Sequence, residues 1–148
     1  IDTFDKMEAK VIKSVPELEK LGSMLKMHGL PFSDLDRESI VAFGFYDNDF
    51  LIGTGAIEEL NDSCLLRSLS VNIDFRNRGL GNEIIVFLEQ KAKNKGHDSV
   101  YILTEIPEYF RNKKYKDINR DKAPSSIKNS SEFSQLCPES ASLMMKII

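Results

Sequence analysis

The sequence predicts a mixed α/β domain with one central sheet, and three observations predict it. Residues 64–71 form a compact apolar run that suits a buried strand, and residues 80–92 repeat apolar side chains every four positions, as an amphipathic helix does. Strand-like runs separated by short polar turns precede this pair, which predicts antiparallel hairpins. A further apolar run, residues 99–104, follows the helix, and a helical crossover favours parallel pairing of the strands that it joins.

The length and composition are those of one ordinary globular domain. With 148 residues, a single domain over residues 1–148 can bury its own core. Twenty basic and 23 acidic residues give a net charge of −3, which is no global reason to expect nucleic-acid or membrane binding. No apolar run approaches the ~20 residues that span a bilayer, and residues 1–10 lack a signal-peptide apolar region. Cys64 and Cys137 are too few for a disulfide framework or zinc site, so we expect a cytoplasmic protein without metal.

A strand and a helix are expected ahead of the hairpins. Residues 9–15 suit a first strand. Ser14 stands three positions before Glu17, the spacing of a capping box, and Gly29 suits the end of the helix that follows. A short second helix or a turn is expected at residues 33–35.

Two hairpins lead into the central strand. Residues 40–46 and 50–59 are strand-like runs joined by a polar turn, and a second polar turn leads on to residue 64. Three antiparallel strands are therefore expected in succession. Gly53 and Gly55 lie inside the second of them, where a glycine often marks a bulge or the close approach of a ligand.

The rest of the chain is expected to add short elements around the fifth strand. Lys95 and Gly96 suit the end of the long helix. After residue 104 we expect a short helix, a strand, an irregular and partly helical segment, and a last strand that can close the sheet, at residues 107–113, 115–120, 124–136 and 141–148.

The turn between the central strand and the long helix has the features of a phosphate-binding site. The first amides of a helix have no intrahelical acceptor, and the helix dipole adds partial positive charge there. Gly79 and Gly81 remove side chains that would hold an anion away, while Arg76 and Arg78 add cationic groups. The alternative is a solvated basic turn.

Two other glycine-rich loops fit this turn poorly. A Walker-type loop needs Gly, four residues and then Gly-Lys-Ser/Thr, which the sequence lacks. A Rossmann fingerprint needs a third small residue where Ile84 stands, and a βαβ unit instead of antiparallel hairpins. A Rossmann-type nucleotide binder is therefore a weak alternative.

The turn resembles the strand-to-helix motif of the GNAT superfamily of N-acetyltransferases, Arg/Gln-x-x-Gly-x-Gly/Ala, which Arg76, Gly79 and Gly81 match. The resemblance implies the GNAT acyl-CoA N-acyltransferase fold, an α/β fold of the α+β kind with a mixed sheet of about six to seven strands and helices on both faces. It also implies a cleft where the fourth and fifth strands splay apart, with the first helices and their loop as one wall of the acceptor pocket.

The same resemblance implies acetyl-CoA as co-substrate and a small-molecule amine as acceptor. In that family the amides of the turn bind the pyrophosphate, and the strand before it pairs with the pantetheine arm. The chain could assemble as a homodimer. The residues implied in cofactor binding are Leu69, Ser70, Val71, Arg76, Asn77, Arg78, Gly79, Leu80, Gly81 and Asn82.

Further segments resemble one branch of this superfamily, the arsenic-resistance-associated and related amino-acid N-acetyltransferases. That branch implies direct transfer, in a ternary complex, to the amino group of an amino acid or of a glutamate-like toxin such as arsinothricin or phosphinothricin. The matching segments are Leu30-Pro31, Gly55-Ala56-Ile57-Glu58, Leu65-Leu66-Arg67-Ser68, Glu132-Phe133 and Leu136-Cys137-Pro138-Glu139-Ser140-Ala141.

Acetyl transfer to an amine needs a group that accepts the proton of that amine. Glu58 is the first candidate, directly or through a water, and a surface carboxylate is its alternative role. Arg67 is charged within an apolar strand, so it binds either a substrate carboxylate or a structural partner such as Glu58. Thr104, Glu105 and residues 130–137 are expected to complete the acceptor pocket.

The chain departs from the family at the helix after the fifth strand. Many relatives use a tyrosine there as general acid toward the CoA thiolate, but Phe110 occupies its place. We expect Tyr109 to belong to the core, and solvent to protonate the thiolate. Because the usual acid is missing, a non-catalytic acyl-CoA-binding or sensing domain is the main alternative.

Overall fold

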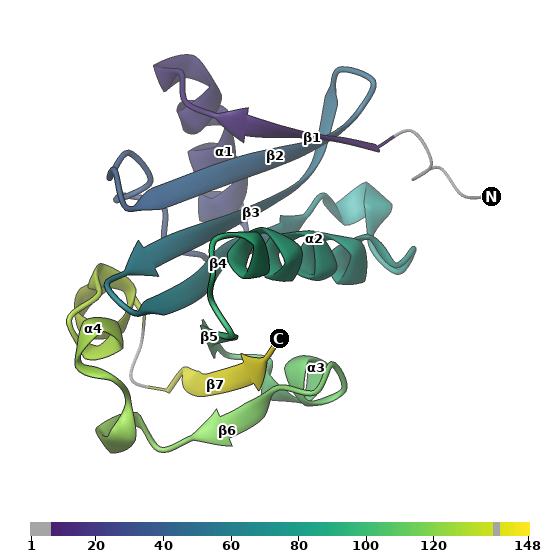
Figure 1. Cartoon of the computed structure of the whole chain (residues 1–148). Helices are drawn as coiled ribbons and strands as arrows, with labels where there is room; N and C mark the ends of the chain where they lie inside the picture. The colour runs from purple at the N-terminus through teal and green to yellow at the C-terminus, as the bar shows by residue number, and fades with distance from the viewer. Residues whose placement is uncertain (1–6, 138–139) are drawn as a thin grey trace.

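The computed structural model describes residues 7–137 and 140–148, which contain one seven-stranded sheet in the order β1-β2-β3-β4-β5-β7-β6 (Figure 1). The strands are β1 (Met7–Ile12), β2 (Ile40–Asp47), β3 (Phe50–Leu60), β4 (Ser63–Val71), β5 (Ser99–Thr104), β6 (Lys116–Ile118) and β7 (Ser142–Ile147). The helices are α1 (Val15–Met27), α2 (Leu80–Asn94), α3 (Pro107–Arg111) and α4 (Ser125–Lys128). The expected mixed α/β fold is confirmed.

The strands of the first half pair as the hairpins predict. β1, β2, β3 and β4 are antiparallel neighbours. β5 joins β4 in parallel, but only through the pairs Leu65 with Tyr101 and Leu66 with Ile102. The expected splaying of these two strands is therefore confirmed, and β4 has no partner on β5 from Arg67 onward in this register.

The last strand of the chain does not form the edge of the sheet. β7 pairs antiparallel with β5 along its whole length and with the three-residue β6 on its other side. The tail was expected to close the sheet as its last strand. It joins the sheet as β7, but it lies between β5 and β6, so the short β6 forms the edge.

Local signals place the start and end of α1. Ser14 accepts a hydrogen bond from the Glu17 amide at 3.3 Å, and its hydroxyl donates to the Glu17 carboxylate at 2.8 Å. Gly29 adopts a left-handed φ of 72° just after the helix. The first strand, expected to reach residue 15, ends at Ile12 because the cap at Ser14 commits Val15 to the helix.

Helices α1 and α2 lie on opposite faces of the sheet (Figure 1). Leu88 of α2 belongs to a core cluster with Phe43 of β2, whereas Leu25 of α1 belongs to another with Ala42, the neighbouring residue of the same strand. Successive side chains of a strand point to opposite faces, so β2 serves both clusters. In the described residues, no helix is both long enough and apolar enough to cross a membrane.

Gly53 and Gly55 of β3 allow α2 to pack close to the sheet. A Cβ at Gly53 would lie 2.7 Å from Cδ1 of Ile84, and one at Gly55 would lie 2.8 Å from Cδ1 of Leu88. The β3–β4 register shifts beside Gly55 as in a bulge, so the first of the two expectations for these glycines is met. The close approach, however, is that of α2.

This packing predicts the outcome of Gly55→Ala. The added methyl group would press on Leu88 and Ile84, so we expect the free energy of unfolding to fall by about 1–3 kcal/mol. The matched control is Gly22→Ala in α1, where the new Cβ would make an ordinary 3.7 Å contact with Phe32. Because alanine is the better helix former, Gly22→Ala should be neutral or stabilising by roughly 0.5–1 kcal/mol. Urea unfolding checks both, and equal losses of stability would contradict the packing argument.

Candidate active site

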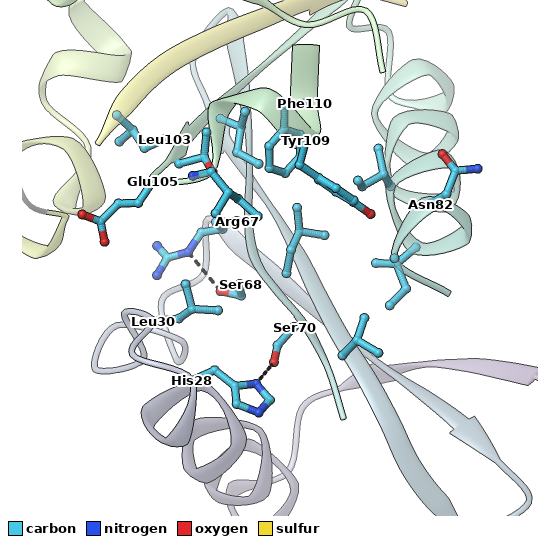
Figure 2. A pocket seen from close by; sticks show the side chains of 18 of the residues that line it. His28, Leu30, Arg67, Ser68, Ser70, Asn82, Leu103, Glu105, Tyr109 and Phe110 are labelled. Atoms are coloured by element: carbon cyan, nitrogen blue, oxygen red, sulfur yellow. Dashed lines mark hydrogen bonds between the residues drawn. The ribbon is translucent and has the colours of Figure 1, made fainter. Parts of the chain in front are cut away.

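A cavity of about 750 Å³ opens where β4 and β5 separate (Figure 2). Its walls come from β4, the start of α2, the end of α1 with the loop that follows, β5 and α3. Glu132, Cys137 and Ala141 add a wall from the part of the chain between α4 and β7, which we call the C-terminal segment. The wall expected from the first helix and its loop is present in His28, Gly29, Leu30 and Pro31. The same cavity reaches from the glycine turn, residues 76–81, to Arg67.

The glycine turn leaves the start of α2 open to the cavity. Gly79 is the N-cap with φ 82°, Asn77 also has a positive φ of 64°, and no side-chain oxygen caps the helix. The Arg76 Nε donates to the carbonyl at the end of β4 at 3.0 Å. Nine of the ten expected cofactor residues line the cavity, the exception being Arg78, whose guanidinium lies 5.4 Å from the Phe75 ring centroid.

A bulge in β4 interrupts the cavity wall. Pairing with β3 jumps from Ser70 to Arg67, so Ser68 and Leu69 stand opposite one position of β3. Ser68 has φ 60°, which few residues other than glycine adopt, and its carbonyl accepts from Thr54 Oγ1 at 2.7 Å. The bulge therefore removes two residues from the β3 ladder where the cavity meets Arg67.

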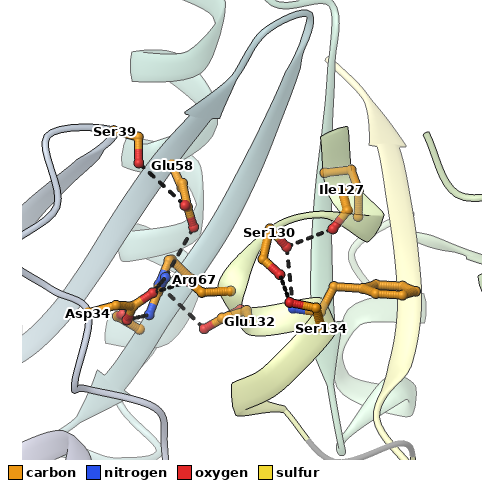
Figure 3. A network of polar contacts seen from close by, with 11 residues as sticks. Asp34, Ser39, Glu58, Arg67, Ile127, Ser130, Glu132 and Ser134 are labelled. Atoms are coloured by element: carbon orange, nitrogen blue, oxygen red, sulfur yellow. Dashed lines mark hydrogen bonds and ion pairs between the residues drawn. The ribbon is translucent and has the colours of Figure 1, made fainter. Parts of the chain in front are cut away.

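Arg67 is buried and contacts three carboxylates, which together with it we call the Arg67 cluster (Figure 3). Its Nη1 and Nη2 donate to the two oxygens of Asp34 at 2.7 and 2.5 Å, and Nη1 also donates to Glu58 at 3.1 Å. Its Nε lies 3.4 Å from Oε2 of Glu132. The structural pairing with Glu58, one of the two roles expected for Arg67, is present, while its contact with substrate stays a prediction.

The charges of the Arg67 cluster do not balance, because one guanidinium faces three buried carboxylates. Burial alone would raise the pKa of Asp34, but hydrogen bonds from Arg67 and Ser131 hold that pKa below its ordinary value. Burial raises the pKa of Glu132 from 4.5 to about 7, and the attraction of Arg67 offsets this only in part. Glu132 therefore changes its charge near neutral pH.

The residues expected in catalysis and in substrate binding do not all line the cavity. Arg67 and Thr104 line the cavity, whereas Glu58 is not among the described residues that do so. Glu58 is 2% exposed and accepts from Arg67 and from Ser39, so its alternative role as a surface carboxylate is wrong. The Thr104 hydroxyl accepts from the Ile106 amide at 3.0 Å. A role for Glu58 as base stays a prediction, and a water or Arg67 would have to connect it to the cavity.

Tyr109 and Phe110 take up roles that only the structure shows. Phe110 is 4% exposed and belongs to the core, whereas Tyr109 is 38% exposed, and both line the cavity (Figure 2). Neighbouring residues of a helix lie about 100° apart, so α3 buries one ring and leaves the other partly exposed. The expectation of Tyr109 in the core is wrong. Its hydroxyl oxygen would lie 2.5 Å from a Cβ at Gly81, over the first turn of α2.

His28 and Glu132 are two further cavity residues. No role was assigned to His28 from the sequence, and Glu132 was expected only as part of the segment, residues 130–137, that completes the acceptor pocket. The Nδ1 of His28 shares a hydrogen bond with the Ser70 hydroxyl, and burial followed by the charge of Arg76 lowers the His28 pKa. Glu132 lies in a segment that resembles the family, yet nothing in the sequence separates it from other glutamates. The only sequence signal for His28 is its place on the apolar face of α1.

Comparisons with known proteins agree with this geometry. The model of the acetyltransferase (GNAT) family matches residues 12–114. An uncharacterized N-acetyltransferase from Chlorobaculum tepidum is 32% identical over 62 residues, which cover 42% of this chain and 40% of that protein.

Solved structures share the fold at low sequence identity. N-acetylglutamate synthase from Neisseria gonorrhoeae, in complex with coenzyme A and N-acetyl-glutamate, has a TM-score of 0.76 at 14% identity, over 95% of this chain and 35% of the synthase chain. A Mycobacterium tuberculosis protein in complex with CoA has a TM-score of 0.74 at 16% identity, over 95% and 99% of the two chains. An acetyltransferase from Streptococcus agalactiae has a TM-score of 0.74 at 15% identity, over 98% and 100%. With a family match over most of its length, a splayed β4–β5 pair and an open glycine turn, the chain belongs to the acetyltransferase (GNAT) family.

Proposed function

We propose that the protein is an acetyl-CoA-dependent N-acetyltransferase that acts on the amino group of a small amino acid or amino-acid-like toxin. The proposal is carried by the single cavity that joins the start of α2 to the Arg67 cluster along the free edge of β4. Such a cavity suits a phosphate-bearing carrier at one end and an amine at the other. CoA in two similar structures supports the carrier, and N-acetyl-glutamate in one of them supports an amino-acid acceptor.

The start of α2 and the edge of β4 are the parts that would hold acetyl-CoA, which supplies the activated acetyl group when bound. The amides of residues 79–82 and the side chain of Arg76 suit a diphosphate. The Tyr109 hydroxyl stands beside the same turn. Residues 69–71 have no β5 partner in the register, so an extended pantetheine arm can pair with them as an added strand.

The Arg67 end of the cavity has the parts that acetyl transfer needs. The bulge at Ser68 frees backbone donors from the β3 ladder, and such donors polarise a thioester carbonyl. The amine nitrogen bonds to the acetyl carbon while the carbon–sulfur bond breaks. Arg67 and Thr104 line this end of the cavity and would contact the acceptor, and solvent would supply the proton of the thiolate. We infer a glutamate-, phosphinothricin- or arsinothricin-like acceptor from the resembling segments, and the reaction needs no metal.

A non-catalytic acyl-CoA-binding domain is the second candidate. It is favoured by the position of Glu58, the expected base, whose carboxylate is engaged by Arg67. Such a domain would keep the glycine turn and bind the carrier without transferring its acetyl group.

The glycine turn predicts a loss of CoA affinity in Gly79→Asp. The carboxylate would stand at the start of α2 and repel the diphosphate, so calorimetric titration should show CoA binding weakened by roughly ten- to a hundredfold. Gly96→Asp is the matched control, because both glycines have a positive φ and open space around them at opposite ends of α2. Gly96→Asp should bind CoA as the wild type does. Equal binding by Gly79→Asp would remove the diphosphate from this turn.

The proposed activity predicts thiol release from acetyl-CoA on mixing with an acceptor panel. Glutamate, phosphinothricin and arsinothricin should each be tested beside their N-acetylated forms, which have no free amine. A thiol-reactive dye detects the released CoA. We expect release with at least one free amine and none with its acetylated form. CoA binding without release across a wider panel of amino acids would instead support the non-catalytic candidate.

A further inference from the structure

The Arg67 cluster presents excess negative charge to the acceptor end of the cavity. Three carboxylates lie within 4 Å of the guanidinium nitrogens. The Cys137 thiol beside Glu132 adds no charge, because burial first, and then Glu132 itself, raise the pKa of that thiol to about 12. Arg120, whose charge also acts on this thiol, donates to the carbonyl of Ala141. Arg67 is therefore the one cation that contacts the carboxylates among the described residues.

The three carboxylates are held with different strength. Asp34 binds both terminal nitrogens of Arg67 at 2.5 and 2.7 Å, and Glu58 binds one at 3.1 Å. Glu132 lies 3.4 Å from Nε, which the Ser68 hydroxyl also contacts at 3.4 Å, and it accepts a hydrogen bond from the Cys137 thiol. Of the three, only Glu132 lines the cavity, and it points toward Arg67 from the C-terminal segment (Figure 3). Glu132 is thus the carboxylate that an incoming cation can reach.

The donors of Arg67 are largely in use. Asp34 and Glu58 accept from both hydrogens of Nη1 and one of Nη2, and Ser68 accepts from Nε. A substrate carboxylate would have to displace a buried carboxylate to obtain a two-pronged contact. A substrate ammonium, in contrast, would meet a cavity wall that carries excess negative charge.

We propose that Glu132 binds the ammonium group of the acceptor and removes its proton before acetyl transfer. This inference rests on the proposed function and names the base within it. One N–H bond of the ammonium breaks and an O–H bond forms on the Glu132 carboxylate. The freed nitrogen lone pair forms the bond to the acetyl carbon and the carbon–sulfur bond breaks. The second proton of the nitrogen passes to solvent, and solvent protonates the thiolate. Glu132 then returns its proton to solvent.

The titration of Glu132 suits this task. Burial, as the main cause, brings the pKa of its carboxyl group to about 7, where a base is both available and strong enough at neutral pH. Because the base must be ionised, activity should rise with pH through this region and level off above it. Glu58 and Asp34 lie behind Arg67 and position the guanidinium.

The test is the pH dependence of kcat/KM in the full chain, with the acceptor that the panel identifies. Glu132→Gln should lower kcat/KM by about 10²-fold or more at pH 8 and lose the rising limb near pH 7. Glu59→Gln is the matched control, since Glu59 also pairs with a cation, Lys95, but is not among the described residues that line the cavity. Its profile should follow that of the wild type. Glu132→Asp keeps a carboxylate, so it should regain part of the rate together with a rising limb.

Calorimetry with CoA separates the two proposals. Glu132→Gln should bind CoA with wild-type affinity, which also shows that the variant folds. If it keeps the rising limb, or loses rate equally at every pH, Glu132 is a structural residue and the inference is overturned. If the wild type transfers to no amine at all, the proposed function fails and takes this inference with it.

Discussion

The buried guanidinium of Arg67 is the interaction on which the acceptor end of the molecule depends. It joins three segments that are far apart in the chain, since Asp34 follows α1, Glu58 lies on β3 and Glu132 belongs to the C-terminal segment. A lone charge in this position would be costly, and removal of one partner from a buried pair typically costs about 3–5 kcal/mol. The cluster therefore fixes where the wall of the cavity stands.

The cavity forms in the sheet because part of β4 is not paired with a neighbouring strand. Its parallel pairing with β5 ends after Leu66, and its antiparallel pairing with β3 skips Ser68 and Leu69. Both interruptions fall in the same part of the strand as Arg67. The backbone that the sheet leaves unpaired is thus available to an extended ligand, between the anion-binding start of α2 and the charged cluster.

Features set by near neighbours in the chain could be predicted from the sequence. The glycine turn, the apolar face of α2 and the hairpins into β4 depend on local spacing, and the structure has all three. The Arg67 cluster could not be predicted as a whole, because Ser131 and Asp34 are 97 positions apart and meet only in the folded chain. Tyr109 was wrongly expected in the core, because the sequence does not show which of two neighbouring aromatic side chains a short helix buries; the structure buries Phe110.

Ionisation of Glu132, the proposed base, lowers the stability of the folded protein, and binding of the acceptor can offset this loss. The folded-state pKa of Glu132 is raised above the ordinary value of 4.5, so the stability gained by burying it neutral is complete below that pH and is lost as pH rises through about 7. The ionised form needed for proton transfer is therefore the less stable one. An ammonium beside it restores the balance of charge, which favours binding of the acceptor. The amide group of the product is uncharged and lacks this attraction, so the buried carboxylate that attracts the substrate ammonium also favours release of the product.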